Sequence, residues 1–516
     1  MKGETAKIRR RNDARPNSDY IKICKTCGIC GGLKLKPGTL CTSLREEAAL
    51  SFKYPETFPQ TYDGSRFSSD AMDCAIPIAL DSHSGCSYNC LYCFSNNLFE
   101  RRSDPVIKSI QESGAPLYRE WPTAKLEKFL ARENRDKWSM AAYTLMDRGA
   151  PVQLGALGDP FDELELHSGW AKKAIPLFIK YKQPVRISTK GGITLQRKDY
   201  LKLFEKSPEQ FWVAWSIICN DDERIARVDV KAPVTSERLK AMKALTNIGV
   251  RCSLRFRPFL PGLSDSYPGE PEAWRVLIER AREAGAEAVS FEFIFLDTRL
   301  SPRQRAMYQL MFREMGRPDF GEWWNSHSNP KETCRRASRA IKYEMTMKVR
   351  EKVHELGMRF GISDPHFKEF NDTGCCCGFP EQDSWFGGWS RRQMTEVIVQ
   401  ARKAYERGEP RLFNYEDWKP AWAHMIPLNN VEPARSWHAY RRKKFKTYGD
   451  ALRDKWNNPL DPRGPYLYFG KVLVPMGRDL NTGDLVYEYQ PWYPGKESKT
   501  IYRDTGYRDL RVGEER

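Results

Sequence analysis

The chain of 516 residues has no long hydrophobic run. Its longest apolar stretches, such as residues 75–80, are far shorter than the about 20 residues that a membrane-spanning helix needs. The basic N-terminus, with Lys7 and Arg9, is not followed by an apolar segment, so no signal peptide is predicted. We find no internal repeat and no phosphate-binding loop. We therefore expect a cytoplasmic protein that does not contact a membrane.

Cysteine, in contrast, is plentiful, with 14 residues in the chain. A hydrophobic content of 40% and a charged content of 29% are typical of a globular protein, and the length allows two or three domains. Many of the cysteines lie in tight groups, which favours metal ligation in a reducing compartment over disulfides. The net charge of +17 indicates either a polyanionic partner such as nucleic acid or a basic surface that maintains solubility.

One cysteine group, Cys86, Cys90 and Cys93, has the spacing Cys-x3-Cys-x2-Cys. Iron–sulfur clusters are ordinarily held by one thiolate per iron, so three thiolates leave one iron of a 4Fe–4S cluster without a protein ligand. An open coordination position distinguishes a reactive metal site from a structural one. A zinc site is the alternative, but the second cysteine pair of a zinc ribbon does not follow closely, since the next cysteine is Cys219.

This loop, with the aromatic Tyr92 directly before its last cysteine, resembles the cluster loop of the radical SAM superfamily. The resemblance implies that S-adenosylmethionine (SAM) binds the open iron through its amino and carboxylate groups. It also implies that the cluster, reduced by flavodoxin or ferredoxin, breaks the sulfonium bond to give a 5′-deoxyadenosyl radical. Cys86, Cys90 and Cys93 would then be the catalytic metal ligands, and Tyr92 would contact the cofactor.

Downstream of the loop, predicted strands and helices alternate. Strands are predicted at residues 75–80, 151–157, 184–189, 211–217, 250–256 and 288–295, and helices at 168–180, 195–206, 235–248 and 272–284. This alternation predicts an α/β fold with a parallel sheet and right-handed crossovers. Six such units would form the partial (β/α)6 TIM-type barrel of radical SAM enzymes, with the cysteine loop at the carboxyl end of the first strand, where barrels place reactive groups.

We expect three parts in the chain. Residues 1–70 form a small Cys-rich N-terminal segment, residues 71–365 form the barrel, and residues 366–516 form a basic, Trp-rich C-terminal extension. Within the extension, residues 471–475 and 485–489 predict a small β-hairpin or SH3-like piece. The basic run 441–446 lies among tyrosines, which suits a groove that pairs phosphates and stacks bases, although a solvated helix face is equally consistent with it.

Several predicted strand ends resemble those of the spore photoproduct lyase-like branch (DNA repair photolyase-like) of the superfamily, over residues 75–300. The matching segments include residues 154–161, 186–191, 215–217 and 257–265. The resemblance implies that Lys190 contacts the SAM carboxylate, that Ser216 contacts its ribose or carboxylate, and that Gly155, Gly158 and Asp159 line the floor under the methionine moiety. Taken alone, Lys190 could also be a solvated lysine, Ser216 a plain strand residue and Asp159 a turn or helix cap.

The chain also departs from the lyase pattern. The lyase returns a hydrogen atom with a cysteine at the second strand end and a tyrosine just after the cluster loop, where this chain has Ala156 and Phe94. Neither side chain donates a hydrogen atom readily. We therefore expect a relative with a chemistry other than thymine-dimer repair.

Two further cysteine groups lie outside the predicted barrel. Cys24, Cys27, Cys30 and Cys41 have ferredoxin-like spacing and predict an auxiliary iron–sulfur cluster or a zinc knuckle. The downstream group consists of three successive cysteines, Cys375, Cys376 and Cys377. In a regular backbone they cannot all face one metal, but two of them could bind a metal with a partner such as His366. The other interpretations of this group are a redox-active thiol, a hydrogen donor near the barrel mouth and small buried residues.

We thus expect a radical SAM enzyme (a lyase, an isomerase or a base-modifying enzyme) that abstracts a hydrogen atom from a nucleic acid or nucleotide base. The base would be flipped or single-stranded, since a base inside a duplex is unreachable. Candidate substrate contacts at strand ends are Arg255, Arg257 and Glu292. The alternatives are a radical SAM enzyme that modifies a peptide or protein with auxiliary clusters, and a non-catalytic, zinc-stabilised nucleic-acid-binding protein. The oligomeric state is not predicted.

Overall fold

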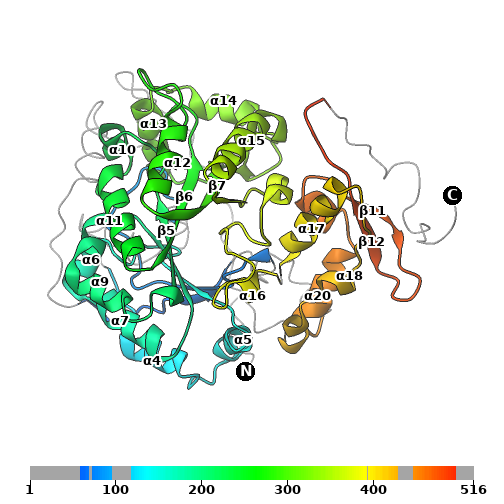
Figure 1. Ribbon diagram of the computed structural model, residues 1–516, viewed down its shortest axis with the longest axis horizontal. Helices are drawn as coiled ribbons and strands as arrows, with labels where there is room; N and C mark the ends of the chain where they lie inside the picture. Colours follow the sequence, from blue (N-terminus) through cyan, green and yellow to red (C-terminus); the bar gives the residue numbers. More distant parts are fainter. Residues whose placement is uncertain (1–57, 69–72, 96–117, 392, 428–444, 496–516) are drawn as a thin grey trace, which may run out of the picture.

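The computed structural model describes residues 58–68, 73–95, 118–391, 393–427 and 445–495 (Figure 1). A sheet of eight strands lies at its centre, in the order β1-β2-β3-β4-β5-β6-β7-β10. The first strand, β1 (Ser65–Phe67), pairs antiparallel with β2. From β2 onward all neighbours pair in parallel, so the sheet is a parallel one with an antiparallel edge strand.

All six predicted strands occur in this sheet. They are β2 (Ile78–Leu80), β3 (Val152–Leu154), β4 (Val185–Thr189), β5 (Phe211–Ser216), β6 (Arg251–Phe259) and β7 (Ala286–Phe293). A seventh parallel strand, β10 (Arg359–Ile362), pairs with β7 and was not predicted. It has four residues, among them an arginine and a glycine, which is too short and too mixed a run to give a clear strand pattern.

Helices cover the outer face of the curved sheet (Figure 1). The four predicted helices are α7 (Trp170–Lys180), α9 (Lys198–Phe204), α11 (Thr235–Asn247) and α12 (Ala273–Glu283). In α7 the buried side chains recur at one face of the helix, the pattern of a helix that packs on a sheet. The other helices of this part are α4 (Thr123–Leu130), α5 (Lys137–Met146), α6 (Glu163–Ser168), α8 (Gly192–Gln196), α10 (Asp222–Val228), α13 (Pro302–Glu314), α14 (Phe320–Ser326) and α15 (Arg339–Glu355).

The C-terminal part lies to one side of the sheet, in yellow to red (Figure 1). It contains the predicted hairpin, as the antiparallel pair β11 (Leu473–Arg478) and β12 (Leu485–Tyr489). One hydrophobic core cluster extends from Phe67 to Tyr489, so this part shares its core with the sheet. Its helices are η4 (Pro365–Phe370), α16 (Gly387–Ser390), α17 (Met394–Glu406), α18 (Tyr415–Trp418), η5 (Ala421–Met425), α20 (Tyr448–Trp456) and α21 (Pro465–Tyr468).

A short segment after β10 packs back against the sheet. Asp372 accepts a hydrogen bond from the backbone N–H of Phe360 in β10, and its own N–H donates to the Phe360 carbonyl at 3.0 Å. Further along, the rings of Phe379 and Phe386 pack against Trp212 of β5, with centroids 5.1 and 6.1 Å from it. Residues 371–386 therefore run beside β10 and reach β5. None of the helices in the described part of the chain is long and apolar enough to span a bilayer.

Candidate functional site

The cysteine loop follows β2 directly and is tied to the next strand by Asp81. The Oδ1 atom of Asp81 accepts hydrogen bonds from the backbone N–H groups of Ala156, Leu157 and Gly158, at 2.8, 2.8 and 3.2 Å. These three residues belong to the loop after β3. Because β2 and β3 are parallel neighbours, their following loops meet at the same edge of the sheet, and one carboxylate holds them together.

A second set of contacts docks the cysteine loop on the turn that precedes α6. The backbone N–H and the hydroxyl of Ser87 donate to Asp162 Oδ2 at 2.6 and 2.9 Å, and Tyr88 donates to the Phe161 carbonyl at 3.0 Å. Asp162 also accepts from the Leu164 N–H as the N-cap of α6. The turn and the loop are thereby fixed to each other by hydrogen bonds whose partners are all buried.

Two of the predicted glycines are explained by this close docking. A Cβ on Gly158 would lie 2.5 Å from the carbonyl oxygen of Gly85 in the cysteine loop. Gly155 has a φ of +80°, and a Cβ there would lie 2.6 Å from the Pro160 ring. At Gly155 only glycine satisfies both the positive φ and the close approach, and at Gly158 the close approach alone excludes a side chain. These residues therefore position the loop, and their predicted contact with the methionine moiety of SAM stays a prediction.

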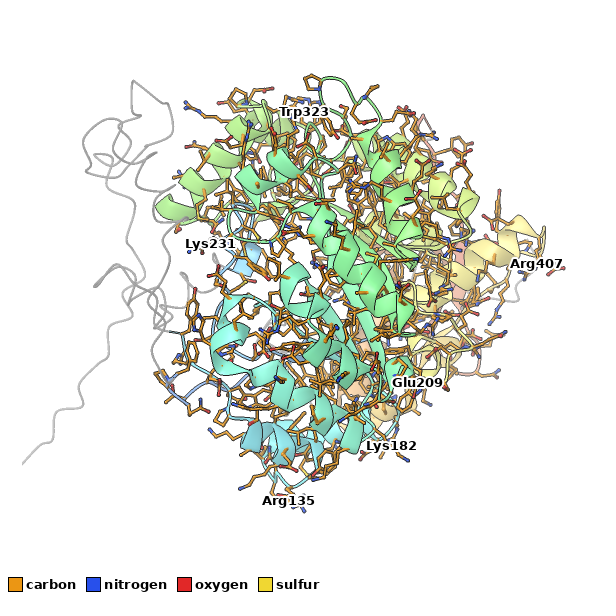
Figure 2. All side chains as sticks on the ribbon, turned by 60° about the vertical axis from the view of Figure 1, so that its left-hand side comes forward. Arg135, Lys182, Glu209, Lys231, Trp323 and Arg407 are labelled. Carbon is orange, nitrogen blue, oxygen red and sulfur yellow. The ribbon has the colours of Figure 1, made fainter. Side chains whose placement is uncertain are left out.

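The third side of the cysteine loop is held from distant parts of the sequence. Leu91 N–H donates to the Val228 carbonyl at 3.0 Å, and Lys231 N–H donates to the Tyr88 carbonyl at 3.2 Å. From α13, the Tyr308 hydroxyl donates to the Tyr92 carbonyl at 3.4 Å. Lys231 is labelled in Figure 2, where it lies at the left edge of the molecule. The loop is thus enclosed by the strand ends, by the α10–α11 connection and by α13.

Within the loop, Cys90 is buried, whereas Cys86 and Cys93 are half-buried, and all three are free thiols. Burial raises the pKa of Cys86, with further contributions from Asp162, Asp159 and the Cys90 thiol. Burial also raises the pKa of Cys90, which is coupled electrostatically to Cys93. The three predicted ligands therefore lie near one another at the carboxyl end of β2.

Lys190 points at this loop from the end of β4. Its ammonium group donates to the Tyr92 hydroxyl at 2.7 Å and lies 3.5 Å from Cys90 Sγ. It also lies 4.8 Å from the centroid of the Tyr92 ring. Burial lowers the pKa of Lys190, but the neighbouring Asp229 and Cys90 outweigh this and raise it. The structure thus brings the predicted Lys190, Tyr92 and Cys90 together around a lysine that stays charged.

The counter-charge of Lys190 is Asp229, which the sequence did not reveal. Asp229 is completely buried and lies 3.3 Å from Lys190 and 2.7 Å from Arg238 of α11. Burial alone would raise the pKa of Asp229, but the positive charges of Lys190 and Arg238 outweigh burial and lower this pKa to about 2. Arg238 also donates to the Ser216 carbonyl at 2.8 Å. A buried ionic cluster therefore links the cysteine loop, β4, β5 and α11.

The predicted Asp159 is also buried, and its carboxylate is fully engaged. It accepts from Phe161 N–H at 3.0 Å, from the Thr189 hydroxyl at 2.8 Å and from Lys190 N–H at 2.6 Å. These contacts connect the turn after β3 to the end of β4. The side chain thus serves the turn, which is the second of its two interpretations.

Ser216 and the candidate substrate contacts lie on the concave side of the sheet. The Ser216 hydroxyl accepts from Arg255 at 3.2 Å, and Arg257 lies 3.6 Å from Glu292. Arg257 also approaches Cys376 Sγ at 3.9 Å. The structure therefore gathers three predicted strand-end candidates and one member of the cysteine triplet in one place.

The cysteine triplet follows η4 and lies against β7 and β10. The Cys376 carbonyl oxygen accepts a hydrogen bond from the Ser290 hydroxyl at 2.6 Å. The same oxygen lies close to Gly361, where an added Cβ would be only 2.5 Å from it. Cys375 and Cys377 are buried, and Cys376 is half-buried. His366 lies instead beside Gly470 and near Asp364, and burial lowers its pKa to about 4.

Other predicted groups fall outside the described residues. These are Cys24, Cys27, Cys30 and Cys41 and the basic residues 441–444. Within the described residues, no three His, Cys, Asp or Glu side chains form a group that could hold a single metal ion. A 4Fe–4S cluster takes one thiolate at each of its irons, so its ligands do not converge on one point. Three neighbouring free thiols beside a buried cation match the donor set and the charge that such a cluster requires.

No family model and no curated protein matches the chain. Solved structures do match. They include structures of spore photoproduct lyase. The lyase complexed with dinucleoside spore photoproduct has a TM-score of 0.38 and 13% identity, over 61% of this chain and 82% of that chain. A lyase mutant with bound AdoMet and the same dinucleoside has a TM-score of 0.38 and 11% identity, with the same coverage.

A weaker similarity is found to Streptococcus suis SuiB bound to its precursor peptide SuiA. Its TM-score is 0.28 with 14% identity, over 43% of this chain and 40% of that chain. Spore photoproduct lyase is also the protein whose branch the sequence motifs resemble.

Proposed function

We propose that the chain is a radical SAM enzyme that acts on a nucleic acid base. Cys86, Cys90 and Cys93 would hold three irons of a 4Fe–4S cluster, and SAM would take the fourth. The observation that carries the proposal is the placement of three free thiols at the carboxyl end of the first parallel strand, with the Lys190 ammonium 3.5 Å from Cys90. With one electron from flavodoxin or ferredoxin, the bound cluster would supply the chemistry that cleaves SAM into methionine and a 5′-deoxyadenosyl radical. This radical would take a hydrogen atom from a C–H bond of the substrate.

Lys190 and its partners set the charge of this site. Asp229 holds the ammonium group in position and keeps it protonated. A lysine is a compact cation that suits both a carboxylate and electron-rich thiolates. Lys190 would therefore orient the SAM carboxylate, and Asp229 is a positioning residue that acts through it.

The docked loops restrict water around the thiols. Gly158 and Gly85 bring the loops after β2 and β3 into contact, and Asp81 fastens them with three hydrogen bonds. Cys90 is buried in the docked loop, whereas Cys86 and Cys93 are half-buried. Exclusion of water suits a radical reaction, because it prevents side reactions of the reactive group.

The choice of a nucleic acid base as substrate is supported by the net charge of +17. Phosphate contacts made by lysine and arginine supply most non-specific affinity for nucleic acids. The target base would be flipped or single-stranded, because enzymes cannot reach an atom of a base that is still stacked inside a duplex.

The decisive experiment uses protein reconstituted with iron and sulfide under anaerobic conditions. With dithionite and SAM, we expect 5′-deoxyadenosine to form. The Cys90→Ala variant should lose bound iron and this product, whereas the Cys334→Ala variant, which changes a half-buried cysteine outside the loop, should keep both. Zinc alone at the loop, or no 5′-deoxyadenosine from iron-loaded protein, would contradict the proposal.

A second measurement tests the substrate class. DNA oligonucleotides with deuterated bases are added to the same reaction, and 5′-deoxyadenosine is analysed for deuterium. Transfer from a base is the expected result. Transfer only from a deuterated peptide would instead identify a peptide-modifying enzyme.

A further inference from the structure

Three arginines gather on the concave side of the sheet, below the cysteine loop. Arg186 is in β4, and Arg255 and Arg257 are in β6, on either side of β5. The charge of Arg257 acts on Arg186 and on Arg255. In the strand register Ser188 lies opposite Ala214, and Ala214 lies opposite Ser253, so Arg186 and Arg255, each two residues from one of these serines, lie on the same face of the sheet. Tyr92 is also near enough to influence the pKa of Arg255, so the group extends toward the cysteine loop.

Each guanidinium has hydrogen-bonding capacity that the protein leaves unused. Arg186 is 2% exposed and donates to the Ser188 hydroxyl through Nη1. Its Nε and Nη2 atoms have no partner among the residues that the structure describes, and the same holds for the Nε atoms of Arg255 and Arg257. Buried donors without an acceptor are rare in proteins, because each one costs about 1–3 kcal/mol. Several such donors within one group of neighbouring arginines are therefore a sign of a ligand.

The charge at this place is also unbalanced. Among the described residues, one carboxylate forms an ion pair with the three arginines. It is Glu292, which lies 3.6 Å from Arg257. The neighbouring Cys376 does not compensate, because its pKa is raised well above the usual value and the thiol is neutral at pH 7. Burial, together with Arg257 and Arg186, lowers the pKa of Arg255 to about 9. Three cations thus face one carboxylate, an arrangement that an incoming anion would relieve.

The group is accessible from one side. The side chains of Arg257 and Glu292 are 12% and 19% exposed, whereas Arg186 lies deeper. Arginine presents its N–H groups as a planar fork that matches the two oxygens of a carboxylate or a phosphate. The geometry, the unused donors and the charge therefore point to the same class of ligand.

We propose that Arg186, Arg255 and Arg257 bind an oxyanion, a carboxylate or a phosphate, that the substrate carries into the barrel. This inference deepens the proposed function and rests on it for the identity of the substrate. Ordinary pyrimidine and purine bases carry no negative charge at pH 7. The oxyanion is therefore either the phosphate of the target nucleotide or an acidic substituent on a base that has already been modified, and oligonucleotide binding separates these two sources.

The binding site is tested first with inorganic phosphate on the full-length, iron-loaded protein. Phosphate should raise the midpoint of thermal unfolding above that in chloride of equal ionic strength. This increase should disappear in Arg255→Gln and be reduced in Arg257→Lys, which keeps the charge but not the fork. It should persist in Arg275→Gln, a control on the exposed face of α12. No increase in the wild type, or an equal increase in Arg255→Gln, would overturn the inference.

Thermal unfolding also shows whether the carboxylate that the arginines bind belongs to SAM or to the substrate. If SAM and phosphate stabilise the protein additively, the arginines are available to the substrate, as proposed. If saturating SAM abolishes the phosphate effect, the arginines bind the SAM carboxylate, and the assignment to the substrate is wrong.

The substrate class is tested with single-stranded oligonucleotides that contain either 5-carboxycytosine or 5-methylcytosine. The carboxylate should tighten binding about tenfold, the ratio expected for one charged hydrogen bond of about 1.5 kcal/mol, and Arg255→Gln should remove the difference. Equal affinities in the wild type would rule out an acidic base as the source of the oxyanion, and binding of both oligonucleotides that Arg255→Gln leaves unchanged would overturn the inference. The proposed function fails separately, if iron-loaded wild type produces no 5′-deoxyadenosine while phosphate still binds.

Discussion

The buried carboxylate of Asp229 should be far more important for stability than any surface carboxylate of the barrel. The perturbation is Asp229→Asn, which keeps the shape of the side chain and removes its charge. Two cations, Lys190 at 3.3 Å and Arg238 at 2.7 Å, would then remain buried without a counter-charge. Loss of one partner from a buried ion pair typically destabilises a protein by about 3–5 kcal/mol.

The pKa of Asp229 gives an independent magnitude. Its lowering from 3.8 to about 2 corresponds to about 2.5 kcal/mol in favour of the ionised form in the folded protein. We therefore expect Asp229→Asn to lower the free energy of unfolding of the metal-free protein by about 3 kcal/mol, measured by urea denaturation. Adding Lys190→Met should restore part of this loss, because one of the two unpaired cations is then gone.

The matched control is Asp199→Asn. Asp199 also lies between two cations, 2.8 Å from Lys172 and 3.0 Å from Arg197, but at the surface. Exposed ion pairs contribute little to stability, so this variant should unfold almost like the wild type. If Asp229→Asn were no more destabilising than Asp199→Asn, the buried ionic cluster would not have the role assigned to it here.

Three further outcomes follow from the contacts around the cysteine loop. Gly158→Ala should reduce iron incorporation, because its Cβ would lie 2.5 Å from the Gly85 carbonyl, whereas Gly388→Ala, with open space around its Cβ, should not. Asp81→Ala should lower the free energy of unfolding by about 3 kcal/mol, since three backbone N–H groups lose their acceptor, and Asp81→Asn should lower it less. Because the pKa of Asp229 is lowered from 3.8 to about 2, its stabilisation is complete above about pH 4 and is lost as the pH falls to about 2. A pH series of unfolding should show a smaller loss for Asp229→Asn than for the wild type in that window.

Much of the fold could be predicted because its signals are local. Each of the six predicted strands is an apolar run, and four of the intervening helices show a single apolar face. The strand β10 was missed because its four residues carry too little of this pattern. The position of the cysteine loop followed from its place after the first strand.

The ionic cluster could not be predicted in the same way. Asp229 and Arg238 lie in charged stretches that look like the solvent-exposed face of a helix or a loop. Their complete burial depends on the packing of the α10–α11 connection and α11 against the cysteine loop. A charged residue in such a stretch carries no local sign of its future partner.

The amino-acid sequence by itself determined the succession of strands and helices and the spacing of three thiols after the first strand, because both depend on near neighbours in the chain. Only the tertiary structure decided that Arg186, Arg255 and Arg257 face one another, and that Cys376 approaches them from beyond β10. Their meeting depends on the curvature of the sheet and on the return of residues 371–386 along it. These are long-range packing choices, and neither leaves a periodic signal in the order of residues.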